Sequence, residues 1–346
     1  MWDTASYLNS FYNMYPPLNE FYFEDYPIGR DPFYVLLNST VKSLGGRFYV
    51  VQLIHAAFIN ILIFKYISKH SQYVFTCLLF YVIISYLNLS MEIMRGSFGI
   101  VLSLYANDYF LNKKWLKGYL LLIIGLMFHV QTFLMFFIPL LFFLRLNRKG
   151  VVVLICAFIA ARALQGGYGD YLMLLNLDGT VGTKLEGYAE SDYFGGQGGN
   201  MNHIILHILP NLIYAIFSLY YVKKHQTSES LLRFEPLMMI GILFMVMQIN
   251  LEIVYRFVAF YSIYFALFFG ETFVYLARNN KLSNKKQLYA NALIAFFPFF
   301  LLWGTTHYLS RWTFSPYSSV IERSIVIERE KHLLENNNHS ANRNEY

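Results

Sequence analysis

Residues 89–144 read LSMEIMRGSFGIVLSLYANDYFLNKKWLKGYLLLIIGLMFHVQTFLMFFIPLLFFL and set Glu92, Arg95 and His129 among apolar residues at the density of membrane-spanning helices. An ionisable side chain in such a segment costs roughly 3 kcal/mol or more unless it faces a partner or a water-filled cavity. These three side chains are therefore candidates for the working site of a membrane enzyme.

Helical spacing places part of this stretch on one small, polar face. At about 100° per residue, the residues that share the face are Glu92, Arg95, Gly96, Gly99, Ser103 and Asn107. The other faces carry large apolar side chains that suit lipid or neighbouring helices. The alternative is that Glu92 and Arg95 only form an ion pair, three residues apart, at a helix end.

Composition indicates an all-α, polytopic integral membrane protein. The chain has 346 residues, of which 56% are hydrophobic and 14% charged, whereas an average soluble domain is about 25% charged. Apolar runs recur from Phe48 to Tyr308, which excludes a soluble globule. The formal charge of +6 arises largely from Lys and Arg between these runs, and no nucleic-acid motif accompanies it, so we expect no nucleic-acid partner. Cys77 and Cys156 lie inside apolar segments, which argues against a disulfide or thiolate zinc site.

The apolar runs predict about nine to ten helical segments. The candidates are 47–66, 73–89, 95–111, a broken pair within 116–144, 151–164, 203–222, 236–251, 254–277 and 288–309. We expect an extracytoplasmic or interfacial segment at 1–46, one transmembrane domain at 47–310 and a polar tail at 311–346. Within the first segment, an amphipathic piece at 33–44 ends at Gly45 and Gly46.

Basic residues fall in alternate connections, which the positive-inside rule assigns to the cytoplasm. The segment 1–46, the turn near Glu92 and the long loop 165–202 are then extracytoplasmic. Since the chain starts outside without a signal peptide, we expect a first spanning helix to be missing from this reading frame.

The broken pair within 116–144 has basic residues on both flanks, so it enters and leaves on the cytoplasmic side. Each leg of about a dozen residues rises about 18 Å, well short of the roughly 30 Å hydrocarbon core. We predict two tilted or half-length legs that turn at His129–Gln131 near the outer leaflet. Broken helices at this depth are tolerated where they pack in protein or line a cavity. Alternatively, His129 is a hydrogen-bonded packing residue.

Two further regions carry polar groups on the predicted outer side. The loop 165–202 is rich in Gly, Tyr and acidic residues, which suits carbohydrate, although it could equally be a flexible connector. A turn holds Glu252, Tyr255 and Arg256 at the predicted depth of Arg95. The alternative is that Glu252 and Arg256, four residues apart, only neutralise one another.

With these residues in hand, the chain resembles the EpsG family of bacterial polysaccharide polymerases, relatives of Wzy-type O-antigen polymerases. The resemblance lies in Asp31–Asn38 with Gly45-Gly46, Met91–Arg95 followed by Gly96 and Gly99, Lys114–Lys117 leading to Phe128-His129, and Tyr255–Phe257 with Pro316-Tyr317. The chain departs from the family in having Gly96 where Gln commonly follows the arginine, and in lacking the family's usual N-terminal helix.

The resemblance implies transfer of a growing undecaprenyl-pyrophosphate-linked glycan onto the next lipid-linked repeat unit, at the outer face of the bacterial inner (cytoplasmic) membrane. Arg95 and Arg256 would stabilise the leaving pyrophosphate. His129 or Glu92 would take the proton of the acceptor hydroxyl. We rank His129 first, because Glu92 would be occupied in holding Arg95.

Arg30, Asp31, Tyr255 and Glu252 are the expected substrate-binding residues. No Asp-x-Asp or His cluster stands in the predicted outer loops, so we expect neither metal nor other cofactor. Membrane lipid is an expected partner, and whether a regulator protein sets chain length stays open. The competing classes are a lipid-linked glycan flippase or transporter, an envelope ligase or acyltransferase, and a purely structural membrane protein.

Overall fold

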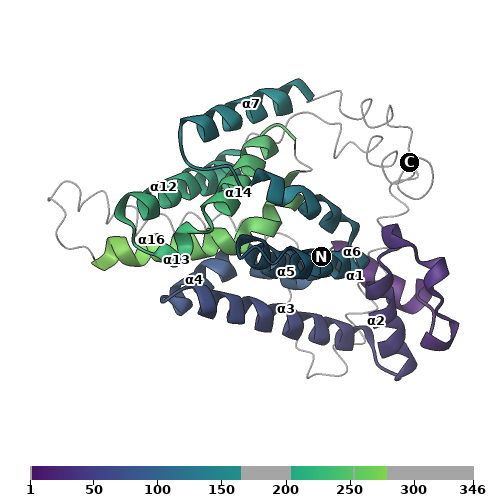
Figure 1. Cartoon of the computed structure of the whole chain (residues 1–346). Helices are drawn as coiled ribbons and strands as arrows, with labels where there is room; N and C mark the ends of the chain where they lie inside the picture. The colour runs from purple at the N-terminus through teal and green to yellow at the C-terminus, as the bar shows by residue number, and fades with distance from the viewer. Residues whose placement is uncertain (1, 165–203, 252–253, 279–346) are drawn as a thin grey trace.

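The structure is a computed structural model that describes residues 2–164, 204–251 and 254–278. Within these ranges every regular element is a helix, as predicted for an α-helical membrane protein (Figure 1). The predicted loop 165–202, the segment 288–309 and the tail 311–346 lie outside the described residues, as does Glu252.

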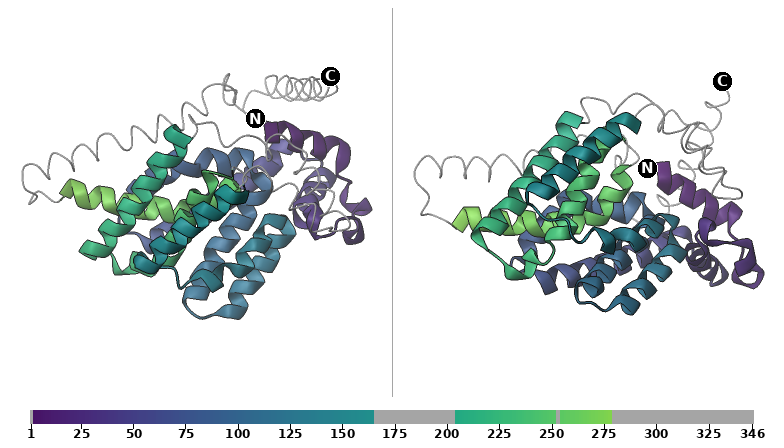
Figure 2. Two further views of the ribbon diagram at one scale, coloured as in Figure 1. Left: turned by 90° about the horizontal axis from the view of Figure 1, so that it is seen from above. Right: turned by 45° about the horizontal axis from the view of Figure 1, so that its top comes forward.

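The N-terminal segment consists of short helices and tight turns that lie at one end of the bundle (Figure 2). In order they are α1 (Trp2–Asn9), η1 (Ser10–Met14), η2 (Leu18–Glu20), η3 (Phe23–Asp25), η4 (Ile28–Arg30) and α2 (Pro32–Ser43). Pro32 suits the first turn of α2 because a helix leaves that N–H unpaired anyway. The chain leaves α2 through Gly45, whose φ of +73° favours glycine. The predicted helix at 33–44 is thus confirmed.

The first half of the bundle follows the predicted runs closely. Its elements are α3 (Phe48–His70), α4 (Val74–Tyr81) with the π-helical continuations η5 (Val82–Tyr86) and η6 (Asn88–Glu92), α5 (Met94–Leu111), α6 (Trp115–Phe128), η7 (Val130–Leu141) and α7 (Arg148–Leu164). The second half comprises η8 (Ile204–Ile208), α12 (Leu209–His225), α13 (Glu229–Leu232), α14 (Glu235–Gln248), α15 (Tyr255–Val258), η10 (Ala259–Tyr261) and α16 (Ser262–Arg278).

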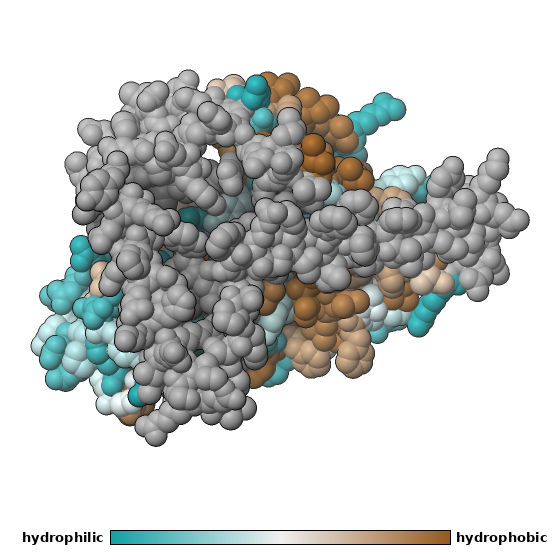
Figure 3. All heavy atoms as spheres, turned by 180° about the vertical axis from the view of Figure 1, so that it is seen from behind, coloured by the Kyte–Doolittle hydropathy of each residue, from teal (hydrophilic) through white to brown (hydrophobic). Residues whose placement is uncertain are grey.

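Two helical runs of the described chain are long and apolar enough to cross a membrane, Phe48–His70 and Tyr255–Arg278. Helix α3 exposes large apolar side chains, among them Leu53, Phe58 and Phe64, which are 40 to 67% exposed. Figure 3 shows apolar residues gathered on broad parts of the surface. Such surfaces are costly in water but match the acyl chains of a bilayer.

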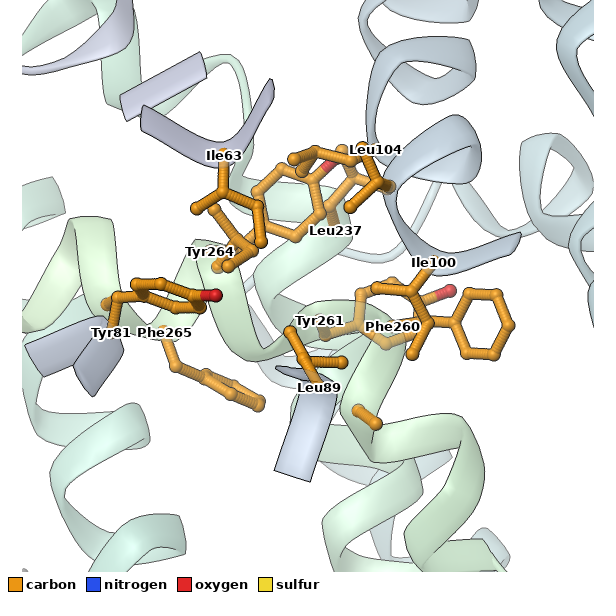
Figure 4. Close-up of a cluster of buried hydrophobic side chains, with 14 of the residues drawn as sticks. Ile63, Tyr81, Leu89, Ile100, Leu104, Leu237, Phe260, Tyr261, Tyr264 and Phe265 are labelled. Atoms are coloured by element: carbon orange, nitrogen blue, oxygen red, sulfur yellow. The ribbon is translucent and has the colours of Figure 1, made fainter. Parts of the chain in front are cut away.

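Helix α5 is the centre of the fold, and most of its side chains are buried. It packs against α6, α3 and η10. A cluster of buried side chains joins the two halves of the chain, with Ile100 and Leu104 of α5 near Phe260, Tyr261 and Tyr264 (Figure 4). Side chains that project from α5 are therefore held by neighbours on several sides.

The predicted broken pair is confirmed as a helical hairpin. His129 has an extended backbone, with φ −161° and ψ 129°, and separates α6 from η7. The legs lie side by side, since the rings of Tyr119 and Phe136 stack with centroids 5.9 Å apart. Thr132 Oγ1 also donates to the carbonyl of Gly125 at 3.2 Å. A Cβ atom at Gly99 of α5 would collide with the Thr132 hydroxyl, so the small face of α5 is where the hairpin docks.

The basic connections meet at the end of the bundle opposite the N-terminal segment. Asp108 pairs with Lys69 at 2.7 Å and also with Arg233. Glu235 pairs with Lys223 at 2.6 Å, and its Oε1 accepts from the backbone N–H of Leu146 at 2.8 Å. Through Asp108 and Glu235, these contacts bring three of the basic connections together, as the alternation of basic loops requires.

Candidate functional site

Asp31 joins the N-terminal segment to the bundle. It precedes α2 and adopts a left-handed backbone, with φ 54° and ψ 56°. Its carboxylate does not cap α2, although an aspartate at this position commonly does so. Asp31 Oδ2 instead accepts from Arg95 Nη1 at 2.7 Å, and Asp31 Oδ1 lies 3.3 Å from His129 Nδ1. One carboxylate therefore contacts two of the predicted catalytic side chains.

The left-handed backbone of Asp31 is informative. A non-glycine residue in this region costs about 1 kcal/mol or more, and Asp and Asn tolerate it best. The Asp31 side chain is 2% exposed, whereas those of His129 and Arg95 are 18% and 36% exposed. The carboxylate is thus the buried anchor, and the cationic and imidazole groups are the parts that reach outward.

His129 gains its position from the hairpin break. If the helix continued through His129, the imidazole would lie on the surface of that helix. The extended backbone at His129 instead directs the ring toward α5 and Asp31. A Cβ atom at Gly96 would lie 3.4 Å from His129 Cδ2, which is van der Waals contact, so the ring packs against the glycine beside Arg95. With Nδ1 facing a carboxylate, the imidazole carries its proton there and presents Nε2 as a base.

Arg95 lies at the start of α5, where α5 approaches the N-terminal segment. Its guanidinium carbon is 5.2 Å from the centroid of the Tyr7 ring, and its Nη1 donates to Asp31. Nearby, burial raises the pKa of Tyr15, and Arg95 partly opposes that rise. The hydroxyl of Tyr15 therefore stays neutral, and the carboxylate of Asp31 pairs with Arg95.

The predicted helical face needs one correction, at Glu92. Glu92 ends η6, and Ile93 breaks the helix with φ −99° and ψ 52° before α5 begins at Met94. Glu92 and Arg95 are therefore not three residues apart on one continuous helix, and the argument that Glu92 holds Arg95 by helical spacing is wrong. The Glu92 side chain itself lies outside the described residues. Asp31 takes the role of carboxylate partner.

Arg256 lies at the same end of the bundle as Arg95. Helices α5 and η10 pack together, with Ile100 and Phe260 in one buried cluster. Arg256 precedes Phe260 by four residues and Arg95 precedes Ile100 by five, so the rises of about 6 and 7.5 Å are similar. Arg256 Nε donates to the Tyr255 hydroxyl at 3.4 Å. The membership of Tyr255 and Arg256 in the site with Asp31 stays a prediction.

Arg30 is exposed. Its Nη1 donates to the carbonyl of Asp25 at 3.4 Å. Among the described residues, no group of three or more His, Cys, Asp and Glu side chains has the arrangement of a metal site. The expected independence from metal stays a prediction.

Sequence reasoning named Asp31 but missed its central position. Asp31 is 64 residues from Arg95 and 98 residues from His129. Helical periodicity relates only residues within one element, so it gives no signal for such a contact. The one signal in the sequence was Asp31 directly before Pro32 at the start of a helix. An aspartate in this position is usually interpreted as an N-cap, so it did not point to a site.

The arrangement combines a base supported by a carboxylate with a fixed cation beside it. A hydroxyl proton can pass to His129, while negative charge that develops nearby is met by Arg95. This is the set of groups required for attack by a hydroxyl with departure of an anionic leaving group.

Comparison with known proteins supplies a family. No curated protein and no solved structure matches the chain. The EpsG family matches it over residues 1–319, a range that contains every described helix and all of the site residues above. The chain therefore belongs to the EpsG family, which gives it a general role in polysaccharide polymerisation.

Proposed function

We propose that this protein joins lipid-linked oligosaccharide repeat units into a longer polysaccharide, at the outer face of the bacterial cytoplasmic membrane. The growing glycan on its undecaprenyl pyrophosphate is the donor, and the sugar of the next lipid-linked repeat unit is the acceptor. The observation that carries the proposal is the bridge from Asp31 to both Arg95 and His129 at the bundle end that bears the N-terminal segment.

In the proposed reaction, an acceptor hydroxyl attacks the anomeric carbon of the donor sugar. The new glycosidic C–O bond forms as the C–O bond to pyrophosphate breaks, and the bonding electrons leave with the lipid pyrophosphate. His129 Nε2 takes the hydroxyl proton, and Asp31 stabilises the resulting imidazolium through Nδ1–H. Atoms and charge balance without an oxidant or reductant.

Arg95 serves the leaving group in this proposal. Its guanidinium is fixed on one side by Asp31 and on the other by the Tyr7 ring, so it needs little reorganisation when charge develops. Arg256 would meet the same pyrophosphate from the second half of the chain, with Tyr255 beside it. Guanidinium groups suit this task because they bind phosphate oxygens in bidentate geometry.

The topology supports placing the reaction outside the cytoplasm. The basic loops gather at the opposite end of the bundle, around Asp108 and Glu235. Lys and Arg in short loops are retained on the cytoplasmic side, which leaves the end with Asp31 on the outer side.

Complementation of a polymerase-null strain tests the proposal. We expect Arg95→Ala and His129→Ala to abolish the glycan ladder on gels at normal expression, because they remove the cation and the base. His129→Gln separates roles, since glutamine can keep a hydrogen bond to Asp31 but cannot accept a proton. A full ladder from His129→Gln would remove the base assignment, and a full ladder from Arg95→Ala would remove the arginine assignment.

Reconstituted vesicles test the main competing class. The proposed enzyme makes longer glycan from lipid-linked repeat units on one face of the vesicle. A flippase would change the sidedness of the lipid without forming a glycosidic bond, and that outcome would overturn the proposal.

A further inference from the structure

A group of aromatic side chains lies on the N-terminal segment just before Asp31. We call it the aromatic platform and define it as Phe21, Tyr22, Phe23 and Tyr26. Tyr22 and Phe23 are 63% and 52% exposed. Phe21 stacks on Tyr26 with centroids 5.4 Å apart and an angle of 7° between the rings, and Phe23 meets Phe21 edge-on at 5.0 Å. Large aromatic rings are thus presented on the surface as an organised set.

The platform is connected to the Asp31 site through further ring contacts. Phe23 lies 6.4 Å from Phe33, and Phe33 lies 5.6 Å from Phe128, measured between centroids. Phe128 directly precedes His129, and Phe33 follows Asp31 by two residues. The ring contacts therefore run from η3 through α2 to α6, and they connect the platform to the residues that we place in catalysis.

The chain that leads into the platform is held by contacts with α2. Lys42 Nζ donates to the carbonyls of Phe11, Tyr12 and Tyr15 at 3.2, 3.2 and 2.8 Å. The backbone N–H of Leu18 donates to Ser43 Oγ at 2.6 Å. Within the platform, the backbone N–H groups of Asp25 and Tyr26 donate to the carbonyls of Tyr22 and Phe23, both at 3.2 Å. A turn held by such bonds loses less conformational entropy when a ligand binds it.

Charge around the platform argues against a bilayer as its occupant. Glu20, Glu24 and Asp25 are exposed there, and Arg30 is the only basic residue among residues 1–30 of the sequence. Segments that rest on membranes combine aromatic rings with Lys and Arg, because lipid headgroups are commonly anionic. Carboxylates repel those headgroups and are costly to bury.

The same combination suits a sugar chain. One face of a pyranose ring consists of C–H bonds that pack on an aromatic face, and its rim carries hydroxyl groups that donate to carboxylates. Burial raises the pKa of Tyr26, with a smaller contribution from Asp25, so the Tyr26 hydroxyl also remains a neutral donor. The platform offers aromatic faces for the C–H bonds of a sugar, and Glu20, Glu24 and Asp25 offer acceptors for its hydroxyl groups.

We propose that the aromatic platform binds the glycan of the lipid-linked substrate and holds it while Asp31, Arg95 and His129 act on its end. This inference rests on the proposed function and adds a second contact region to it. A chain held in this way remains with the enzyme between additions. The platform therefore sets how many repeat units are joined, whereas the Asp31 site forms each bond.

The first experiment uses the complemented strain and two matched double variants. We expect Tyr22→Leu with Phe23→Leu to shift the ladder several-fold toward short glycans, while the first product, two joined repeat units, still forms. Tyr22→Trp with Phe23→Trp should keep long glycans, because the stacking faces remain. Phe75→Leu, at an 86% exposed position on α4 far along the chain, is the control for loss of an exposed ring.

Substitution by leucine distinguishes a sugar chain from a lipid bilayer as the occupant of the platform. It is as apolar as phenylalanine toward lipid but has no flat face for a sugar. If the leucine pair keeps wild-type ladder length, the platform is a membrane contact or has no ligand, and the inference is overturned.

The second experiment measures binding separately from catalysis. The full chain in lipid nanodiscs is titrated with the oligosaccharide that mild acid releases from the strain's own lipid-linked repeat units. Saturation transfer from the protein to the sugar protons should be strong with wild type and Arg95→Ala, and several-fold weaker with the leucine pair. Equal transfer in all three overturns the inference but leaves the proposed function standing. A full ladder from the leucine pair, with loss of the ladder in Arg95→Ala and His129→Ala, would likewise overturn the inference and leave the proposed function standing.

Discussion

Replacement of Asp31 by asparagine tests the centre of the site with little change of shape. The two carboxylate oxygens of Asp31 accept from Arg95 and face His129 Nδ1 at the same time. Asparagine offers one acceptor oxygen and one amide group. It also tolerates the left-handed backbone at this position, with φ 54°, which alanine does not.

Each orientation of the new amide loses one contact. If its oxygen faces Arg95, its NH₂ group faces His129 Nδ1, which must then accept; the ring proton moves to Nε2 and the base is lost. If its oxygen faces His129, its NH₂ group faces the guanidinium, and two donors oppose one another. Loss of a general base costs about a hundredfold to ten-thousandfold in rate. This corresponds to about 3 to 5 kcal/mol of transition-state stabilisation.

The assay is single-turnover joining of two lipid-linked repeat units by the full chain in vesicles. Glu229→Gln is the matched control, since Glu229 is an exposed carboxylate near the basic end of the bundle. Thermal unfolding of both variants shows whether the fold survives. The reasoning is refuted if folded Asp31→Asn protein joins repeat units at the wild-type rate. A double variant with His129→Gln should be little slower than either single variant, because residues that act as a unit are not additive.

Three further predictions concern the fold that holds the site. Gly99→Ala should lower the free energy of unfolding by about 1 to 3 kcal/mol, because its Cβ collides with the Thr132 hydroxyl; adding Thr132→Ala should recover most of the loss, as measured by thermal unfolding in detergent. Lys42→Met should speed proteolysis of the N-terminal segment, because it removes donors to three carbonyls; unchanged digestion would contradict the reasoning. Asp108→Asn should destabilise the chain by about 2 kcal/mol, since a charged partner of Lys69 is lost, and Glu229→Gln should leave the melting temperature unchanged.

The sequence was sufficient for the helices and for the hairpin. Apolar periodicity and basic flanks predicted the runs that became α3 to α7, because lipid requires a long apolar surface and internally paired backbone. The break at His129 followed from length alone, since two legs of about a dozen residues cannot each span a bilayer. The extension of α3 to His70 was missed. Lys69 is held there by Asp108, 39 residues away.

The site was only partly accessible from the sequence. Arg95 and His129 stood out because ionisable groups are rare in apolar runs. Asp31 lies outside those runs, in a segment where carboxylates are common. The sequence therefore does not indicate that its carboxylate is buried. Glu92 was chosen as the partner of Arg95 for its nearness in sequence, and the break at Ile93 removes that reason.

The left-handed residue before α2 also bears on how the protein matures. Arg95 and His129 are positioned by the bundle, whereas Asp31 is positioned by the N-terminal segment, which Lys42 anchors. A newly inserted chain whose bundle is complete and whose leading segment is still loose has neither an oriented imidazole nor a neutralised guanidinium. The N-terminal segment and the bundle must therefore pack together before the three side chains form one site.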